Sequence, residues 1–268
     1  METFGSPADP PILLIMGMAA SMDWWEDEFC ERLAAGPRFV IRYDLRDTGQ
    51  SVTYEAGAPG YSGTDLVEDA VGILDALELP RAHVVGQSMG GALAQVLALE
   101  HPERVSSLTL ISTSGAVEGA GDLPGMTAQA RAAFTAPAPD WSDREAVLVY
   151  MTNMFRALAG HSEPFDEAHQ RALLIRVIER SRSIEASMTN HGLIDGATTN
   201  GALADLGVPT LVIHGSEDPL LPHEHGLALA REIPGAKLLT LERTGHELPR
   251  RTWDAVVPAI LELTTSRR

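Results

Sequence analysis

The chain has 268 residues, of which 44% are hydrophobic, and its formal net charge is -17. These values are typical of a soluble globular protein with one sizeable core, and the negative charge argues against a nucleic-acid partner, because phosphate backbones are bound by clustered Lys and Arg. No apolar run approaches the roughly 20 residues of a membrane span. We therefore expect a cytoplasmic protein with no membrane partner.

Short apolar runs alternate along the chain with segments of helical periodicity. The predicted strands are residues 12–16, 39–43, 82–85, 107–111, 210–214 and 237–241. The predicted helices between and after them are residues 23–35, 64–77, 89–100, 223–232 and 252–263. This alternation predicts an α/β fold with a mostly parallel sheet that helices cover on both faces.

The alternation stops between about residues 115 and 199, where helical periodicity appears at 143–158 and 166–182 without a convincing strand. We interpret this stretch as a helical cap inserted after the sixth core strand. The predicted organisation is thus a core formed by residues 1–114 and 200–268, with residues 115–199 as the cap.

Ser88 is the central residue of the sequence Gly86-Gln87-Ser88-Met89-Gly90, which joins the strand at 82–85 to the helix at 89–100. The Gly-x-Ser-x-Gly pattern alone is weak, since a Gly-rich turn with a capping serine also produces it. A strand-to-helix turn, however, exposes a serine hydroxyl, and its glycines remove side chains that would collide. We therefore predict Ser88 as a nucleophile and the amide of Met89 as a donor to an oxyanion.

The chain resembles the α/β-hydrolase family over nearly its whole length. The segments IMGMAAS (15–21), RYDLRDTGQS (42–51) and HVVGQSMG (83–90) are particularly similar to the anthracycline (aclacinomycin) methylesterases. This resemblance implies hydrolysis of a carboxylic ester through an acyl-enzyme intermediate. Family members begin with an antiparallel hairpin, and only residues 1–11 precede the first predicted strand, so we expect the first hairpin strand to be absent or the chain to begin late.

The order of catalytic groups in the family is nucleophile, acid and base. Asp218 and His246 lie in loops that follow the predicted strands at 210–214 and 237–241, where parallel sheets gather their sites. We predict Asp218 as the acid, with the neighbouring Glu217 as the alternative, and His246 as the base. The resemblance further implies that the backbone amide of Met18 is the second oxyanion donor.

Large apolar side chains near the N-terminus and in the cap could line a substrate pocket, although core packing explains any one of them equally well. These residues are Trp24, Trp25, Phe134, Trp141, Met151, Met154 and Phe155. The pocket would favour a small-molecule ester with a bulky, partly aromatic acyl or alcohol group, and the resemblance to the methylesterases implies a methyl ester. No spacing typical of metal ligands occurs, so we expect neither a metal nor another cofactor.

Two other functions remain compatible with these residues. The first is a cofactor-free perhydrolase of the haloperoxidase type, in which peroxide replaces water at the acyl-enzyme. The second is a non-catalytic binding module of the same fold, against which the complete set of Ser88, Asp218 and His246 argues. The sequence leaves the oligomeric state undetermined.

Overall fold

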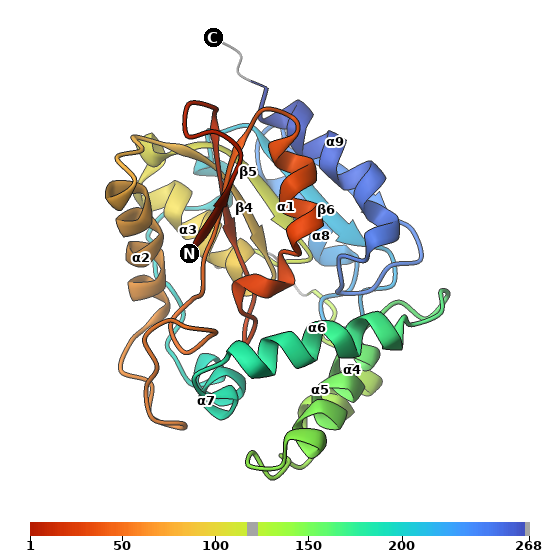
Figure 1. Cartoon of the computed structure of the whole chain (residues 1–268). Coiled ribbons are helices and arrows are strands. Elements are labelled where there is room, and N and C mark those ends of the chain that lie inside the picture. The colour runs from red at the N-terminus through yellow and green to blue at the C-terminus, as the bar shows by residue number, and fades with distance from the viewer. Residues whose placement is uncertain (117–122, 266–268) are drawn as a thin grey trace.

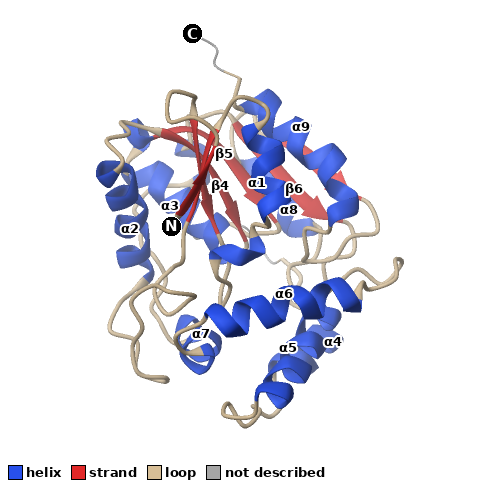
Figure 2. Cartoon of the chain, in the orientation of Figure 1, coloured by secondary structure: helices blue, strands red, loops and turns tan. Residues whose placement is uncertain are grey.

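A computed structural model describes residues 1–116 and 123–265 of the chain. Residues 117–122, at the start of the predicted cap, and residues 266–268 lie outside this description. A central sheet lies between two layers of helices, and a group of further helices lies beyond one edge of the layers (Figures 1 and 2).

The sheet has seven strands in the order β1-β3-β2-β4-β5-β6-β7. They are β1 (Glu2–Phe4), β2 (Pro11–Ile15), β3 (Phe39–Arg42), β4 (Ala82–Gln87), β5 (Val105–Ile111), β6 (Thr210–Gly215) and β7 (Lys237–Leu241). All neighbouring strands pair in parallel except β1, which pairs antiparallel with β3. The predicted α/β architecture is confirmed, including all six strands that the apolar runs indicated.

The three-residue strand β1 lies within residues 1–11, where the sequence predicted no strand. Glu2 pairs with Arg42 across the two strands, and its carboxylate also binds the Arg42 guanidinium. A strand this short has no detectable period, so its pairing partner rather than its own sequence defines it.

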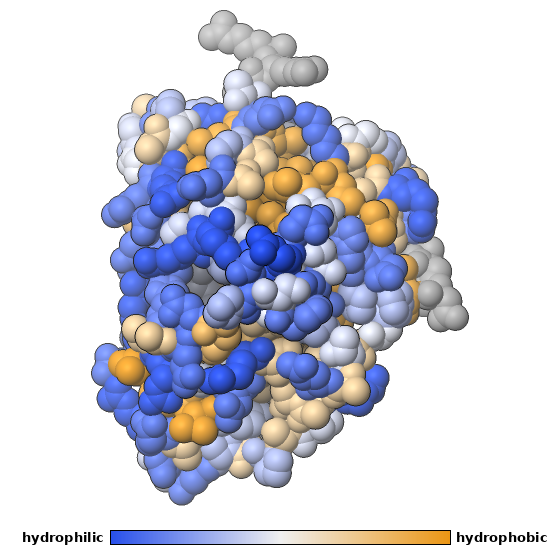
Figure 3. Space-filling model, turned by 90° about the vertical axis from the view of Figure 1, so that its right-hand side faces the viewer, coloured by the Kyte–Doolittle hydropathy of each residue, from blue (hydrophilic) through white to orange (hydrophobic). Residues whose placement is uncertain are grey.

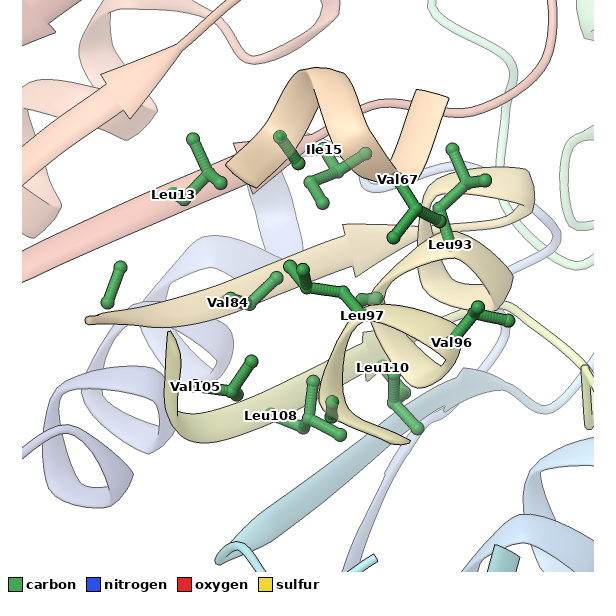
Figure 4. Packing of buried hydrophobic residues seen from close by; sticks show 14 of the residues in the cluster. Leu13, Ile15, Val67, Val84, Leu93, Val96, Leu97, Val105, Leu108 and Leu110 are labelled. Atoms are coloured by element: carbon green, nitrogen blue, oxygen red, sulfur yellow. The ribbon is translucent and has the colours of Figure 1, made fainter. Parts of the chain in front are cut away.

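Alternate residues of the central strands face opposite helical layers, which explains why these strands are continuously apolar. Leu13 and Ile15 of β2 belong to a cluster with residues of α2 and α3, as Figure 4 shows. Ile12 and Leu14 belong to a second cluster with residues of α1 and α9. The helices of the two layers are α1 (Asp27–Ala34), α2 (Gly63–Ala76), α3 (Met89–Glu100), α8 (Glu224–Glu232) and α9 (Trp253–Leu263).

In the described part of the chain, four α-helices lie between β5 and β6 and are called the cap helices below. They are α4 (Ala128–Phe134), α5 (Arg144–Leu158), α6 (Glu167–Arg180) and α7 (Ile184–Thr189). They follow β5, the fifth strand of the described sheet. The predicted position was after the sixth core strand, a number that counts the first hairpin strand, which we expect to be absent. The two positions are therefore the same. The limits 115–199 remain a proposal, because residues 117–122 lie outside the described part of the chain.

Ion pairs join cap helix α6 to the core. Arg180 donates to Asp44 at 2.7 Å and to Asp23 at 2.7 Å, and Arg176 donates to Asp23 at 2.9 Å. Burial alone would raise the pKa of Asp23, but hydrogen bonds from Arg180, Ser21 and Arg176 outweigh burial and lower it. Asp23 belongs to a short 3-10 turn, so α1 begins at Asp27 rather than at residue 23 as predicted.

Hydrophilic residues dominate the face of the molecule in Figure 3 and surround smaller apolar areas. Among residues 1–116 and 123–265, no helix has both the length and the apolar character needed to cross a membrane.

Candidate active site

Ser88 lies at a sharp turn between β4 and α3 in a conformation that is unusual for a residue with a side chain. Its φ is 53° and its ψ is -121°. A Cβ atom at Gly86 would lie 2.2 Å from the carbonyl oxygen of Gly90, and one at Gly90 would lie 2.2 Å from that of Ile15. Only glycine fits at these two positions, so the motif in the sequence is a packing requirement of this turn.

Hydrogen bonds to neighbouring strands hold the strained serine in place. The Ser88 amide donates to the Ile111 carbonyl at 2.9 Å, and the Thr113 hydroxyl donates to the Ser88 carbonyl at 2.7 Å. These two bonds use the backbone of Ser88 and leave its hydroxyl free for another partner. They stabilise a backbone conformation that is unfavourable by itself.

The structure brings the predicted nucleophile, base and acid together in one hydrogen-bonded chain. The Ser88 hydroxyl lies 2.9 Å from Nε2 of His246, and Nδ1 of His246 lies 2.8 Å from Oδ2 of Asp218. Oδ1 of Asp218 accepts the amides of Leu220 and Leu221, each at 2.9 Å. A carboxylate in this arrangement keeps the proton on Nδ1, which leaves Nε2 free to accept the proton of the serine.

The loop that carries His246 is fixed from both the cap and the core. The His246 amide donates to the Leu158 carbonyl at the end of α5 at 2.8 Å, and the Gln87 side chain donates to the His246 carbonyl at 3.2 Å. Gly245 is closely packed there, because a Cβ atom on it would lie 2.4 Å from the Gly160 nitrogen. The cap therefore contributes to the placement of the imidazole.

Glu217, the alternative acid, binds a different part of the molecule. Its carboxylate accepts the amides of His161 at 2.7 Å and Ser162 at 2.9 Å, and also the Ser162 hydroxyl. These bonds, that from the Ser162 side chain foremost, lower the pKa of Glu217. Glu217 thus joins its loop to the cap, and the geometry favours Asp218 as the partner of His246.

Gly17, which precedes the predicted oxyanion donor Met18, lies against the elbow. A Cβ atom on Gly17 would lie 3.1 Å from that of Ser88 and 3.3 Å from the Gln87 carbonyl oxygen. The Ala20 amide donates to the Gly17 carbonyl at 3.3 Å, which closes a turn around Met18 and Ala19. Met18 thus follows a glycine that lies against Ser88, and Met89 directly follows Ser88 in the chain.

A groove of about 320 Å³ lies beside this turn. Its walls are largely apolar and come from the two predicted oxyanion donors, from α3, from the segment after α7, and from single residues at the start of α2 and after β5. They are Met18, Gly63, Met89, Ala92, Leu93, Val96, Ala116, His191, Gly192, Ile194, Gly196 and Ala197. Apart from Met18 and Met89, the sequence does not indicate the walls of this groove, because they have no motif and come from distant segments.

The seven predicted pocket residues occupy other positions, and within the described chain none of them lines this groove. Trp25 is fully buried in the core and stacks on Phe29, so its prediction as a pocket residue was wrong. Trp24 packs on Phe155 with ring centroids 4.2 Å apart. Trp24 and Phe155 share a cap cluster with Trp141 and Met151.

Two of the seven predicted pocket residues do not belong to this cap cluster. Phe134 on α4 is 39% exposed, whereas Met154 on α5 is buried. Apolar composition alone therefore did not distinguish groove walls from packing residues, since burial and cavity lining produce the same sequence pattern.

A mostly parallel sheet with a serine at a strand-to-helix turn defines the class of α/β hydrolases. The chain belongs to this family, whose model, described as alpha/beta hydrolase fold, matches residues 10–249. The resemblance to the methylesterases is also confirmed by two relatives. The chain is 34% identical to rhodomycin D methylesterase DauP of Streptomyces sp. (strain C5) and 33% identical to DnrP of Streptomyces peucetius, in each case over 97% of this chain and 92% of the relative.

A solved structure supports the same conclusion. The chain superposes with a TM-score of 0.75 on the meta-cleavage product hydrolase CumD of Pseudomonas fluorescens IP01, to which it is 25% identical. The alignment covers 98% of this chain and 92% of that hydrolase.

Proposed function

We propose that this protein is a serine esterase in which Ser88 attacks a carboxylic ester, His246 is the general base and Asp218 orients it. The observation that carries this proposal is the continuous chain of hydrogen bonds from the Ser88 hydroxyl through both imidazole nitrogens to Asp218. The amides of Met18 and Met89 are the proposed donors to the oxyanion. The strained elbow and the family membership support the same assignment.

The reaction proceeds in two steps. Ser88 Oγ forms a bond to the carbonyl carbon while its proton passes to Nε2 of His246, and the carbonyl oxygen becomes an oxyanion. Collapse of this intermediate breaks the bond to the alcohol, which takes the proton from His246. Water then attacks the acyl group with His246 as base, and the Ser88 hydroxyl is restored as the acid leaves.

We propose a methyl ester of a bulky, partly aromatic acid as the substrate. Two relatives that align along nearly their whole length are named as methylesterases of rhodomycin D. The apolar groove beside Met18 and Met89 would accept the large group of such an acid, because burial of apolar surface supplies most of the binding energy of small ligands. Methanol would be the small leaving group.

The purified protein is expected to hydrolyse p-nitrophenyl acetate and the methyl ester of a polycyclic aromatic carboxylic acid without an added metal or cofactor. Release of nitrophenolate and appearance of the free acid by chromatography measure the two reactions. Adding hydrogen peroxide should leave free acid as the main product, since the proposal has water as the second nucleophile. Predominant peracid formation would instead identify a perhydrolase, and inactivity on every ester would contradict the proposal.

Replacing Ala92, a wall of the groove on α3, by phenylalanine is expected to lower kcat/KM for the polycyclic methyl ester by about tenfold or more. The larger side chain would fill the space required by the ring system while the triad remains intact. Activity on p-nitrophenyl acetate should change little, because acetate needs little of the groove.

Ala76→Phe is the matched control, because Ala76 is an exposed alanine at the end of α2 and is not a groove wall. This substitution should leave kcat/KM unchanged for both substrates. Equal losses on both substrates in Ala92→Phe would show that the change disturbs the elbow, and the groove would no longer be assigned to the large group.

A further inference from the structure

His191 connects the segment after the cap to the loop of the proposed oxyanion hole. It lies in the short 3-10 turn Asn190–Gly192 that follows α7 and is 3% exposed. Its Nδ1 accepts the amide of Ala19 at 3.0 Å, across 172 residues of sequence. Its Nε2 donates to the carbonyl of Arg46 at 2.7 Å. Both ring nitrogens are therefore committed to backbone groups, and neither is available to a substrate.

The residue that His191 binds has a strained backbone. Ala19 has a φ of 59°, in the left-handed region that non-glycine residues avoid. It directly follows Met18 and belongs to the turn closed by the bond from the Ala20 amide to the Gly17 carbonyl. An alanine in this conformation needs an external partner to hold it, and among the described residues its amide has His191 as that partner.

We propose that His191 is a positioning residue that holds the Gly17–Ala20 turn in the shape that aims the Met18 amide at the oxyanion. The inference rests on the proposed function, because it assigns the aiming of an oxyanion donor to a residue whose ring nitrogens bind backbone groups and whose ring is also one wall of the groove. It deepens that function by giving the segment after the cap a share in stabilising the transition state.

The bond requires a neutral imidazole, since a protonated Nδ1 would place a hydrogen against the Ala19 amide. Burial lowers the pKa of His191, and this effect outweighs the Arg46 carbonyl and Asp47, which act in the opposite direction. The Arg46 carbonyl selects the tautomer with the proton on Nε2. The surroundings thus supply the form of the ring that the bond to Ala19 needs.

The neighbouring Asn190 fixes His191 to the core. Its side-chain oxygen accepts the Gly57 amide at 2.8 Å, and its nitrogen donates to Asp47 at 2.9 Å. Asp47 in turn accepts the Tyr61 hydroxyl at 2.6 Å. These buried bonds give His191 a rigid base, which a residue needs if it is to determine the direction of an amide in another loop.

The test compares two substitutions of His191. His191→Leu removes the acceptor for the Ala19 amide, whereas Oδ1 of His191→Asn can occupy the position of Nδ1. We expect His191→Leu to lower kcat for p-nitrophenyl acetate by about 10- to 100-fold with KM nearly unchanged, less than the roughly 100- to 1,000-fold typical when an oxyanion donor is lost outright. We expect His191→Asn to recover most of that loss.

His83→Leu is the matched control. His83 is also buried and bonded through Nδ1, to Ser107 at 2.8 Å, but it lies near the start of β4 while Ser88 follows the end of that strand. His83→Leu should therefore leave kcat for p-nitrophenyl acetate unchanged. Equal losses in His191→Leu and His191→Asn, or a loss confined to KM, would overturn the positioning role.

A measurement on the unmodified protein decides the proposal without a variant or an ester. In protein labelled with nitrogen-15 histidine, Nδ1 of His191 should be the unprotonated nitrogen at neutral pH. A proton on Nδ1 would exclude the bond from Ala19 and refute the inference even if the esterase is active. Absence of Ser88-dependent turnover would instead refute the proposed function, while the nitrogen spectrum would still report on His191.

Discussion

Ser88→Ala is expected to reduce kcat for p-nitrophenyl acetate by about a millionfold, the loss measured for the serine of another triad enzyme. Alanine cannot form the acyl-enzyme, and the remaining groups have no nucleophile to activate. The fold should persist, because the glycines of the elbow and the Thr113 hydroxyl bond to the Ser88 carbonyl are retained. Initial rates, together with thermal unfolding of both proteins, check this result.

Ser112 provides a matched control for this substitution. It is a buried serine directly after β5 and also has a left-handed backbone, with a φ of 44°. Ser112→Ala should therefore cause a similar backbone perturbation while retaining turnover. If Ser88→Ala kept most of its activity, Ser88 would not be the nucleophile.

Asp218→Asn is expected to lower kcat by roughly ten-thousandfold, by analogy with the same change in another triad enzyme. The amide nitrogen of asparagine can donate to Nδ1 of His246, which would move the imidazole proton to Nε2. In that tautomer His246 cannot accept the proton of Ser88. Because the side-chain oxygen can still accept the amides of Leu220 and Leu221, the loop should keep its shape.

Glu217→Gln is the natural control, since Glu217 is the adjacent carboxylate but binds His161 and Ser162. Its kcat should stay close to that of the unchanged protein, and any effect should appear in thermal unfolding. Rates at saturating ester for both variants distinguish the two residues. A large loss in Glu217→Gln with a small one in Asp218→Asn would transfer the acid role to Glu217.

Local patterns in the sequence were sufficient for the six parallel strands and for the candidate nucleophile. The parallel strands are short apolar runs because they are buried on both faces. Such runs can be recognised in the sequence without knowing which strands lie beside them. The elbow is equally local, since the glycines on each side of Ser88 are required by contacts within the same turn and with β2. Asp218 and His246 could be proposed because their loops follow predicted strands and because their order in the chain matches the acid and base of the family that the chain resembles.

The limits of such patterns are visible in β1 and Trp25. Strand β1 has three residues, too few for a period, and it exists through its pairing with β3. Trp25 was expected in a pocket but is buried beside Phe29, because a large apolar side chain has the same signature in a core and in a cavity wall.

The sequence by itself therefore determined the α/β class and the serine turn, which depend on periodicity and on close spacing. The order of catalytic groups in the family that the chain resembles indicated the candidate acid and base. Only the tertiary structure decided that Glu217 binds the segment between two cap helices, which walls form the groove, and that His191 accepts the Ala19 amide. The physical reason is that these contacts join segments far apart in the chain. A side chain's type restricts what it can bind, but the fold decides which distant backbone group reaches it.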